Sequence, residues 1–331
     1  MKAHSQIIMA PAAKQVRGMA KHLIQPLLVL ALLLVLAGSV CAKPAPSLNM
    51  DPVIGQAIFV SPELAAQVFT DALDAEDRET LKKIFGAASA GLVPTDSIDR
   101  EDIDKYVALY AQSHTLIPEG EQHFTLAIGE DNWTFPVPII KGDSGWYFDT
   151  ETGIEQVRIR QIGRNELATM QAALAYYDAQ IEYAAQDRNG DGILEYAQKF
   201  ISVVGQKDGL YWETKLGEPQ SPLGPLFATE VPEDDYHGYK FRILTSEGPS
   251  AQGGAYDYLI GGRLTGGFAL VAWPVEYGET GVMSFMINQD GIVYESNLGP
   301  DGASTATAMQ SFDPGPEWLP SQDAQASANS D

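Results

Sequence analysis

Cysteine is almost absent from this chain. Its 331 residues include a single cysteine, Cys41, which lies inside the predicted export signal described below. A mature chain without thiols cannot form disulfides, use a cysteine nucleophile or hold a metal through thiolates. The stability of the mature protein must therefore come from packing and from any ion that it binds.

Basic residues are also scarce. The chain has 21 Lys and Arg against 44 Asp and Glu, which gives a formal net charge of -23. Residues 1–42 contain four basic residues and no acidic one, so their removal takes the charge to -27. A strongly acidic protein repels phosphate backbones and anionic membrane surfaces. We therefore expect no nucleic acid among its partners.

The N-terminal segment, residues 1–42, has the pattern of a signal peptide. Basic residues precede the apolar run Leu27 to Ala37, and the small-residue site Val40-Cys41-Ala42 follows it. The apolar run is shorter than the ~20 residues that span a bilayer, so cleavage is favoured over a retained anchor. Cleavage after Ala42 starts the mature chain at Lys43, and we expect a periplasmic or secreted protein with no stable membrane span.

Two details of export stay open. A lipoprotein signal would use Cys41, but it needs a small residue just before the cysteine, where Val40 stands. Translation from Met19 instead of Met1 would give a signal of ordinary length. An exported protein of this kind is expected to meet partners in the cell envelope.

The first half of the mature chain predicts a small α+β domain. Residues 43–56 are rich in proline and predict a linker. After it, Ser61 and Pro62 begin a helix as cap and first-turn residue, and another helix is expected around Ile103 to Ala111. The runs "HFTLAIG", "WTFPVPII" and "GWYFDT" are typical of strands in an antiparallel meander. We expect residues 57–150 to form a curved antiparallel sheet with helices, by analogy cone-shaped and cystatin-like.

The second half predicts another α+β unit, over residues 151–312. Thr152 is expected to cap a short helix that is interrupted at Gly163, and Asn165 to cap a long helix after it. The apolar stripe expected to face a sheet is Leu167, Met170, Leu174, Tyr177, Ile181 and Ala184. The strand patterns are "YKFRILT", "AYDYLI", "FALVAWPV", "GVMSFMIN" and "GIVYES". The predicted class is α+β, with a long helix packed on a second antiparallel sheet and a disordered tail at 313–331.

Many short motifs occur in an order that resembles a known family. They are "WYFDTETG", "IGRNEL", "NGDGILEYAQKF", "KDGLYW", "SPLGPL", "YHGYKFRIL", "GGAYDYLI", "GGFALVAWP" and "GVMSFMINQDGIVYESNLGPD". Together they resemble the bacterial family called domain of unknown function 2950 over most of residues 58 to 315. The resemblance implies an exported protein and supplies no catalytic residues. The second half is also similar to pseudopilin globular heads, although its long helix lacks their apolar N-terminal half.

One loop, "DRNGDGILEYAQKF", has the spacing of a calcium-binding turn. Asp187, Asn189 and Asp191 stand at positions one, three and five, and Gly192 at position six permits a sharp bend. The carbonyl of Ile193 is expected as the ligand at position seven. Hard carboxylate and amide oxygens suit Ca²⁺, which we expect in a structural role.

The loop departs from the calcium pattern at position twelve. Gln198 stands where a bidentate glutamate is expected, so Glu195 or Glu182 would have to supply the missing carboxylate. The alternative is a solvated Asn-Gly/Asp-Gly turn without an ion. Both interpretations remain open from the sequence.

The function that the sequence favours is a non-catalytic binding or interaction module of the cell envelope. The alternative is a periplasmic hydrolase that uses His237 with carboxylates such as Asp208 or Asp257. Geometry separates the two, since a hydrolase needs His237 and the carboxylates to converge in one concave site.

Overall fold

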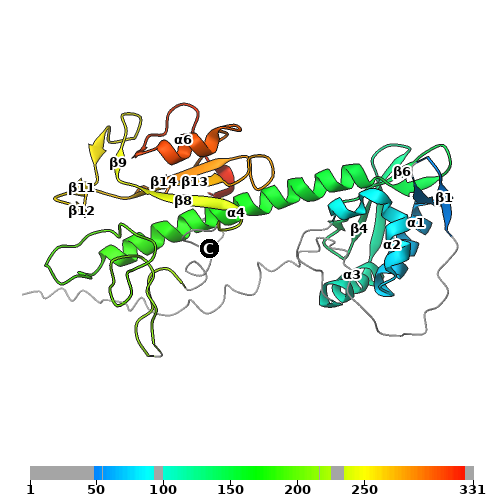
Figure 1. Ribbon diagram of the computed structural model, residues 1–331, viewed down its shortest axis with the longest axis horizontal. Helices are drawn as coiled ribbons and strands as arrows, with labels where there is room; N and C mark the ends of the chain where they lie inside the picture. The colour runs from blue at the N-terminus through cyan, green and yellow to red at the C-terminus, as the bar shows by residue number, and fades with distance from the viewer. Residues whose placement is uncertain (1–47, 54, 93–99, 216, 225–234, 325–331) are drawn as a thin grey trace, which may run out of the picture. The chain divides into compact units, whose positions relative to one another are not determined.

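The computed structural model describes residues 48–53, 55–92, 100–215, 217–224 and 235–324. These form two compact units with their boundary between Val157 and Arg158, here called unit 1 and unit 2 (Figure 1). Helices and antiparallel sheets occur in both, and the predicted α+β class is confirmed. The two units are described separately below.

The described residues of unit 1 form helices, including the first residues of a helix that continues into unit 2, and short strands. Its other helices are α1 (Pro62–Asp74), α2 (Arg78–Phe85), the 3-10 helix η2 (Ala87–Leu92) and α3 (Arg100–Gln112). Its main sheet has the order β3-β4-β6-β7, and β5 pairs with β4. The strands are β3 (His114–Pro118), β4 (His123–Ile128), β5 (Trp133–Thr134), β6 (Ile139–Lys141) and β7 (Trp146–Phe148).

The start of α1 and the core of unit 1 follow directly from the sequence. Ser61 Oγ accepts a hydrogen bond from the Leu64 N–H (3.2 Å), as its predicted capping role requires. Phe69, on the buried face of α1, lies at the centre of the core, and its ring centroid is 4.8 Å from that of Phe135 and 5.5 Å from that of Phe148. Aromatic packing therefore joins the helices to the sheet.

Part of the predicted linker is a β-hairpin. β1 (Asn49–Asp51) pairs antiparallel with β2 (Gln56–Ile58), so the linker assignment is wrong for these residues. Gln56 is buried, and its amide nitrogen lies 3.0 Å from the carbonyl oxygens of both Ile84 and Phe148. Burial of this polar side chain is tolerated because it donates hydrogen bonds to carbonyl groups of two other elements.

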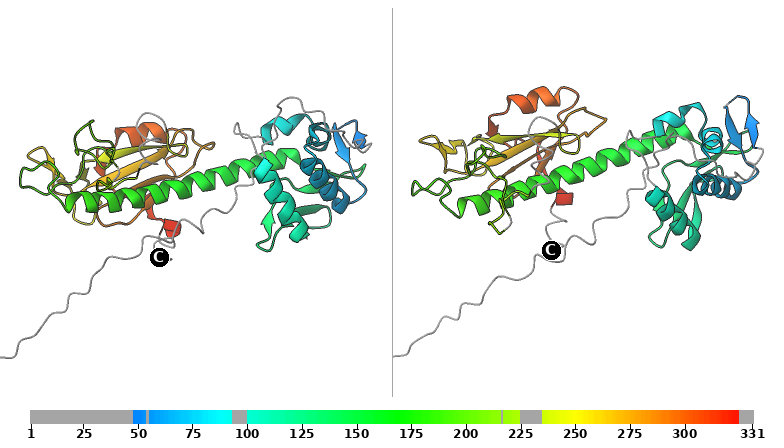
Figure 2. Two further views of the ribbon diagram at one scale, coloured as in Figure 1. Left: turned by 90° about the horizontal axis from the view of Figure 1, so that it is seen from below. Right: turned by 60° about the horizontal axis from the view of Figure 1, so that its bottom comes forward.

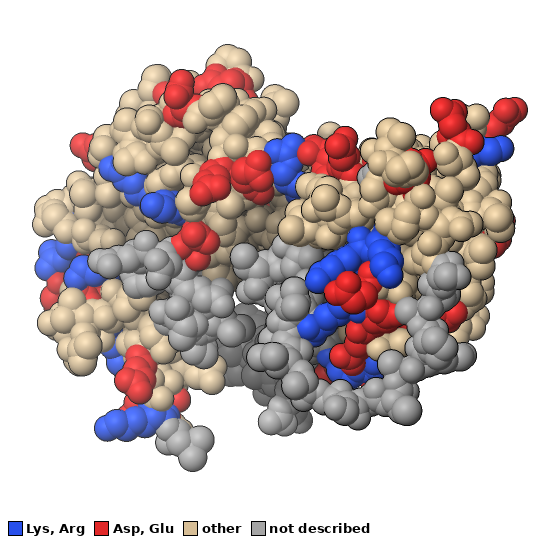
Figure 3. Space-filling view, turned by 45° about the vertical axis from the view of Figure 1, so that its right-hand side comes forward, with Lys and Arg blue, Asp and Glu red and all other residues tan. Residues whose placement is uncertain are grey.

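Acidic and basic side chains are mixed on the surface. Figure 3 shows Lys and Arg lying among Asp and Glu on one face. In unit 1, for example, the Arg100 guanidinium lies 2.9 Å from the Asp74 carboxylate and 2.7 Å from that of Asp104. Such exposed pairs each contribute little to stability.

The helix expected in two pieces is one element. α4 runs without a break from Thr150 to Ala184. The Asp149 carboxylate, and not Thr152, caps its start, accepting from the Thr152 N–H (3.1 Å) and hydroxyl (2.7 Å). Gly163 does not interrupt it, because one interior glycine costs only about 1 kcal/mol, which packing readily offsets. Asn165 lies in the middle of the helix and donates to the carbonyl of Thr280 (2.8 Å).

The face of α4 that is buried in unit 2 differs from the predicted stripe. Leu167 and Ile181 are 38% and 45% exposed. The buried side chains are Asn165, Thr169, Met170, Ala172, Ala173, Tyr176, Ala179, Gln180 and Tyr183. Alanines allow a close approach, and each buried tyrosine finds a carbonyl acceptor, Tyr176 at Ala269 (3.2 Å) and Tyr183 at Lys207 (2.8 Å). The predicted stripe is therefore correct for Met170, Leu174 and Tyr177, which pack in or against the core, and wrong for Leu167 and Ile181.

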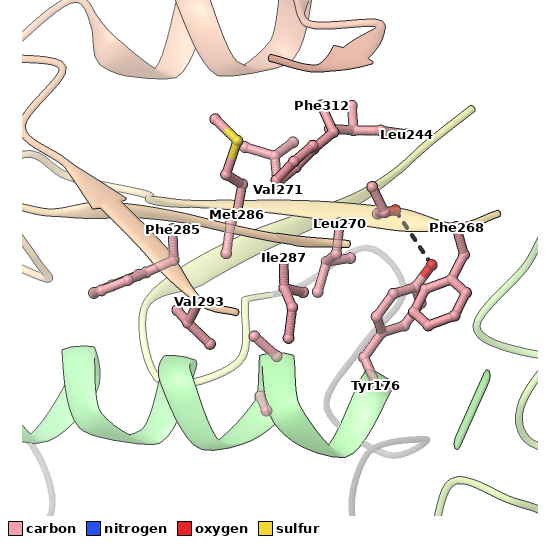
Figure 4. Packing of buried hydrophobic residues seen from close by; sticks show 14 of the residues in the cluster. Tyr176, Leu244, Phe268, Leu270, Val271, Phe285, Met286, Ile287, Val293 and Phe312 are labelled. Atoms are coloured by element: carbon pink, nitrogen blue, oxygen red, sulfur yellow. Dashed lines mark hydrogen bonds between the residues drawn. The ribbon is translucent and has the colours of Figure 1, made fainter. Parts of the chain in front are cut away.

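The main sheet of unit 2 is antiparallel, in the order β17-β15-β14-β13-β8. Its strands are β8 (Tyr239–Leu244), β13 (Ala269–Pro274), β14 (Ser284–Asn288), β15 (Tyr294–Ser296) and β17 (Leu319–Pro320). The unit 2 part of α4 lies along one face, and α6 (Gly302–Ala308) lies on the other (Figure 2). Leu270 and Ile287 point toward α4 while Val271 and Met286 point away (Figure 4), as alternation along a strand requires.

Smaller strands extend the unit. β9 (Ser246–Glu247) lies between β10 (Tyr256–Asp257) and β16 (Ser311–Phe312), and β11 (Leu259–Ile260) pairs with β12 (Arg263–Leu264). Part of the predicted disordered tail is ordered, since β17 pairs with β15 and Trp318 is buried in the core. Burial of the large Trp318 indole stabilises this segment although few of its neighbours in the sequence are apolar.

The N-terminal signal, residues 1–42, and the last residues, 325–331, lie outside the described part of the chain. Within the described part, no helix is both long enough and apolar enough to cross a bilayer.

Candidate functional site

The loop that follows α4, residues 187–195, is organised by its first acidic residue. The Asp187 carboxylate accepts hydrogen bonds from the Gly190 N–H through Oδ1 (2.7 Å) and from the Gly192 N–H through Oδ2 (2.8 Å). The Gly192 bond, more than the others, holds the pKa of Asp187 below its ordinary value. Both glycines have positive φ, 76° and 83°, which explains why glycine stands at these two positions.

The two other predicted ligands repeat the same local pattern. Asn189 Oδ1 accepts from the Asp191 N–H, and Asp191 Oδ1 accepts from the Ile193 N–H, both at 3.0 Å. The Asn189 amide nitrogen donates to Glu195 Oε1 (2.7 Å) and closes the loop. Alternate side chains from Asp187 to Asp191 thus turn inward on their own backbone.

The β11–β12 hairpin supports this loop from outside. Arg263 forms an ion pair with the Asp191 carboxylate. Gln198, at the position where a glutamate was expected, donates to the Gly262 carbonyl (3.1 Å), and Tyr196 forms a β-bridge with Leu264. Within the described residues, no three His, Cys, Asp or Glu side chains are grouped in a way that could hold a metal ion.

Glu195 lies in an unfavourable setting for its charge. Partial burial raises the pKa of its carboxyl, and the nearby negative charges of Asp191 and Asp187 raise it further, while Arg263 opposes them. A cation near Glu195 would therefore offset both the cost of burying its charge and the repulsion from Asp191 and Asp187.

A cleft of about 780 Å³ opens beside the loop, and we call it the 183–208 cleft. It lies between the end of α4 and the two segments that follow it. Its lining consists of Tyr183, Arg188, Asn189, Glu195, Tyr196, Gln198, Lys199, Gly205, Gln206, Lys207 and Asp208. Asn189 and Glu195 belong both to the loop and to the cleft, so the loop forms one of its walls. The volume lies in the range of pockets that bind small ligands.

Tyr183 fixes one side of the cleft. It is only 4% exposed, and its hydroxyl donates to the Lys207 carbonyl, which ties residues 205–208 to α4. Burial raises the pKa of Tyr183 to about 12, with further contributions from Glu195 and Asp208 and an opposing one from Arg188. The phenol is therefore neutral near pH 7, and both carboxylates act on the same hydroxyl.

Arg188 closes the end of α4. Its guanidinium donates to the carbonyls of Glu182 (3.1 Å) and Tyr183 (3.2 Å), which also accept from the N–H groups of Ala185 and Gln186 in the last turn. It also lies 5.6 Å from the Tyr183 ring and 5.4 Å from the Trp212 ring, and the Lys207 ammonium lies 5.3 Å from the same indole. Cation–π contacts thus place two positive groups at the cleft.

Asp208, a carboxylate of the predicted hydrolase, is already engaged. It forms an ion pair with Lys199 and accepts from the Val203 N–H (2.8 Å). Partial burial works against its charge, yet the Lys199 ammonium and the Val203 N–H hold its pKa below the ordinary value. A carboxyl with a lowered pKa is a poor proton donor or acceptor near neutral pH.

His237 and Asp257 lie beyond opposite ends of β8. His237 is in the turn before Tyr239, and Asp257 pairs with Ser246 after the strand. The six residues of β8 alone span about 20 Å, so the two side chains do not form one site.

His237 is also far from Asp208. The residue after it, Gly238, contacts Asn165 of α4, whereas the residue before Asp208 is bonded to Tyr183. Eighteen helical residues separate Asn165 from Tyr183, which corresponds to about 27 Å. The structure thus does not bring the predicted hydrolase residues together.

Seven residues of the cleft lining were not among the predicted site residues, namely Tyr183, Arg188, Tyr196, Lys199, Gly205, Gln206 and Lys207. Tyr183 resembled a helix residue of no special role, and the charged residues resembled solvated loop positions. Two quoted motifs lay near them: "DRNGDGILEYAQKF", which contains Arg188, Tyr196 and Lys199, and "KDGLYW", which contains Lys207.

No curated protein and no solved structure matches the chain. A family model described as a protein of unknown function (DUF2950) matches residues 56–320, which include the loop and the 183–208 cleft. Because the match covers far more than half of the 331 residues, the chain belongs to this family of proteins of unknown function, DUF2950.

Proposed function

We propose that the protein is an exported, non-catalytic binding protein of the cell envelope that holds a small polar ligand in the 183–208 cleft. The observation that carries the proposal is the cleft itself, about 780 Å³ and lined by charged, amide and phenol groups. Polar groups converging in a pocket of this size are typical of small-molecule sites.

The state of the charged groups favours binding over catalysis. Asp208 is paired with Lys199, and the Tyr183 hydroxyl is bonded to a backbone carbonyl. General acid–base catalysis is most efficient when the pKa of the group lies near the working pH. The pKa of Asp208 is lowered and that of Tyr183 raised, so both are shifted away from neutrality.

We also propose that a calcium ion binds the 187–195 loop and stiffens this wall of the cleft. A carboxylate or amide oxygen has two lone pairs, so Asp187, Asn189 and Asp191 can each accept a backbone N–H and still coordinate an ion. The ion would share Asp191 with Arg263 and would offset the repulsion that raises the pKa of Glu195.

Thermal melting tests the calcium proposal. Calcium modules of the extracellular kind bind at roughly 10⁻⁴ to 10⁻³ M, so about 1 mM calcium should add on the order of 1 kcal/mol. For a domain of this size that corresponds to a rise of about 2–4 °C in Tm over the chelated protein. Asp187→Ala and Asp191→Ala should lose the rise, while Asp178→Ala, at an exposed position of α4 outside the loop, should keep it. If calcium leaves the Tm of the wild type unchanged, the loop does not bind calcium.

A ligand screen tests the binding function. The mature chain from Lys43 would be melted with libraries of peptides, amino acids and sugars, and hits would be mapped with Gln206→Ala and Tyr196→Ala, two substitutions in the cleft lining. Ligands that raise Tm and lose affinity in these variants support the proposal. The absence of any hit, or hits that are indifferent to both variants, would contradict it.

A further inference from the structure

We propose that the 183–208 cleft recognises a zwitterionic ligand, one that carries a carboxylate and an ammonium group, as free amino acids and short peptides do. The inference rests on the proposed binding function and specifies the chemistry of its ligand. It follows from which charged groups of the cleft are already paired and which are not.

The cleft is less acidic than the protein around it. The lining contains three basic residues, Arg188, Lys199 and Lys207, against two acidic ones, Glu195 and Asp208, in a chain with 21 basic and 44 acidic residues. A lining with more basic than acidic residues, in a strongly acidic protein, attracts an anionic group that the rest of the surface repels. A ligand with at least one negative group is therefore favoured here.

Two cationic groups are available for that negative group. Lys199 and Asp208 neutralise each other in an ion pair. The Lys207 ammonium has no carboxylate partner among the described residues and contacts only the Trp212 ring. Arg188 donates three of its five N–H groups to Tyr183, Gln186 and Glu182, which leaves one N–H on each terminal nitrogen. A ligand carboxylate near these groups gains charge-assisted hydrogen bonds.

One carboxylate oxygen is available for a positive group. Glu195 Oε1 accepts from Asn189, and Oε2 has no hydrogen-bond donor among the described residues. The loop around it adds the negative charges of Asp187 and Asp191, both of which act on Glu195. A ligand ammonium at Oε2 would gain a charge-assisted hydrogen bond.

The two ends of the site lie close enough for one small ligand. The Tyr183 hydroxyl is bonded to the backbone of Lys207, and the charge of Glu195 acts on that same phenol. Lys207 and Glu195 both line the one cleft of about 780 Å³, a volume suited to a single small ligand. Among the described residues, Gln198 Oε1 and the Gln206 amide have no side-chain hydrogen bond, and both lie in the same lining, where they can bond a peptide group of the ligand.

Titration calorimetry with four related peptides tests this inference. The mature protein, freed of calcium with a chelator, would be titrated with trialanine, its N-acetyl form, its C-terminal amide and the doubly blocked peptide. Trialanine should bind about tenfold or more tightly than either singly blocked form, because each block removes one charge-assisted contact. Equal affinities of the four peptides, or no binding by any of them, would overturn the inference.

Variants assign each end of the ligand to its side chain. Lys207→Met should abolish the preference for the free C-terminus and leave that for the free N-terminus, whereas Glu195→Gln should do the reverse. Lys215→Met and Glu213→Gln, exposed positions outside the lining, are the matched controls and should keep both preferences. Loss of both preferences in every cleft variant, with unchanged Tm, would contradict the assignment.

The outcome also separates this inference from the function on which it rests. If uncharged library ligands bind the cleft and the four peptides do not, the ligand class is wrong and the binding function stands. If no ligand of any class binds, the binding function itself fails.

Discussion

The buried amide of Gln56 connects three elements of unit 1. Its side chain joins the β1–β2 hairpin to α2 and β7 through the carbonyls of Ile84 and Phe148. Gln56→Leu should lower the free energy of unfolding by about 2–3 kcal/mol, because two buried carbonyls lose their donor. Urea denaturation measures the change.

The control for this prediction is Gln67→Leu. Gln67 is exposed on α1 and donates only to Asp71, so its loss should cost less than about 0.5 kcal/mol. Equal costs at the two positions would show that the Gln56 network contributes little.

The raised pKa of Glu195 predicts that the stability of the protein depends on pH. Its pKa is raised in the folded protein, so the folded state binds the proton more tightly than the unfolded chain. The stability that this group contributes is therefore lost as the pH rises from the ordinary pKa through the raised one. Glu195→Gln should flatten the dependence of Tm on pH in that weakly acidic window.

Calcium binding should show the opposite trend with pH. A protonated Glu195 cannot help to bind the ion, so the calcium-induced rise in Tm should shrink between about pH 7 and about pH 4. A calcium effect that is equal at both pH values would exclude Glu195 from the ion site.

At the scale of elements, Glu166 attaches α4 to the main sheet of unit 2. Its Oε1 accepts from the N–H groups of Val282 and Met283, both at 2.9 Å, just before β14. Glu166→Ala should lower the free energy of unfolding by about 1–3 kcal/mol, since two partly buried donors lose their acceptor. Asp178→Ala, on the exposed side of the same helix, should change it by less than about 0.5 kcal/mol, as denaturation would show.

Elements with strong local signals were predictable from the sequence. Ser61 and Pro62 fix the start of α1, as predicted. The continuity of α4 was not predictable, because packing along the helix offsets the weak preference of Gly163 against it. Its buried face depends on the tyrosine hydroxyls finding carbonyl acceptors, which only the tertiary structure provides.

The site was predictable in part. The spacing of Asp187, Asn189 and Asp191 indicated an ordered loop, and each of these side chains does accept backbone N–H groups. The cleft beside it could not be derived, because it depends on Tyr183 bonding to the Lys207 carbonyl and on Arg188 stacking on Trp212. These contacts join residues 24 positions apart in a loop without regular periodicity.

For the whole molecule, export predicts a defined N-terminus. Mass spectrometry of the protein isolated from the envelope or medium should find a chain that begins at Lys43, after cleavage behind Ala42. A chain that retains residues 1–42 would contradict cleavage, and a lipid-modified Cys41 would indicate a lipoprotein.

The central claim is that the 187–195 loop is an ion-stiffened wall of a ligand-binding cleft. Hydrogen exchange of the mature protein, followed by mass spectrometry, tests it most directly. Calcium should slow exchange in peptides that cover residues 187–196, and trialanine should slow it across residues 183–208, with little change elsewhere. Exchange in these segments that stays the same with calcium and with peptide would contradict the account.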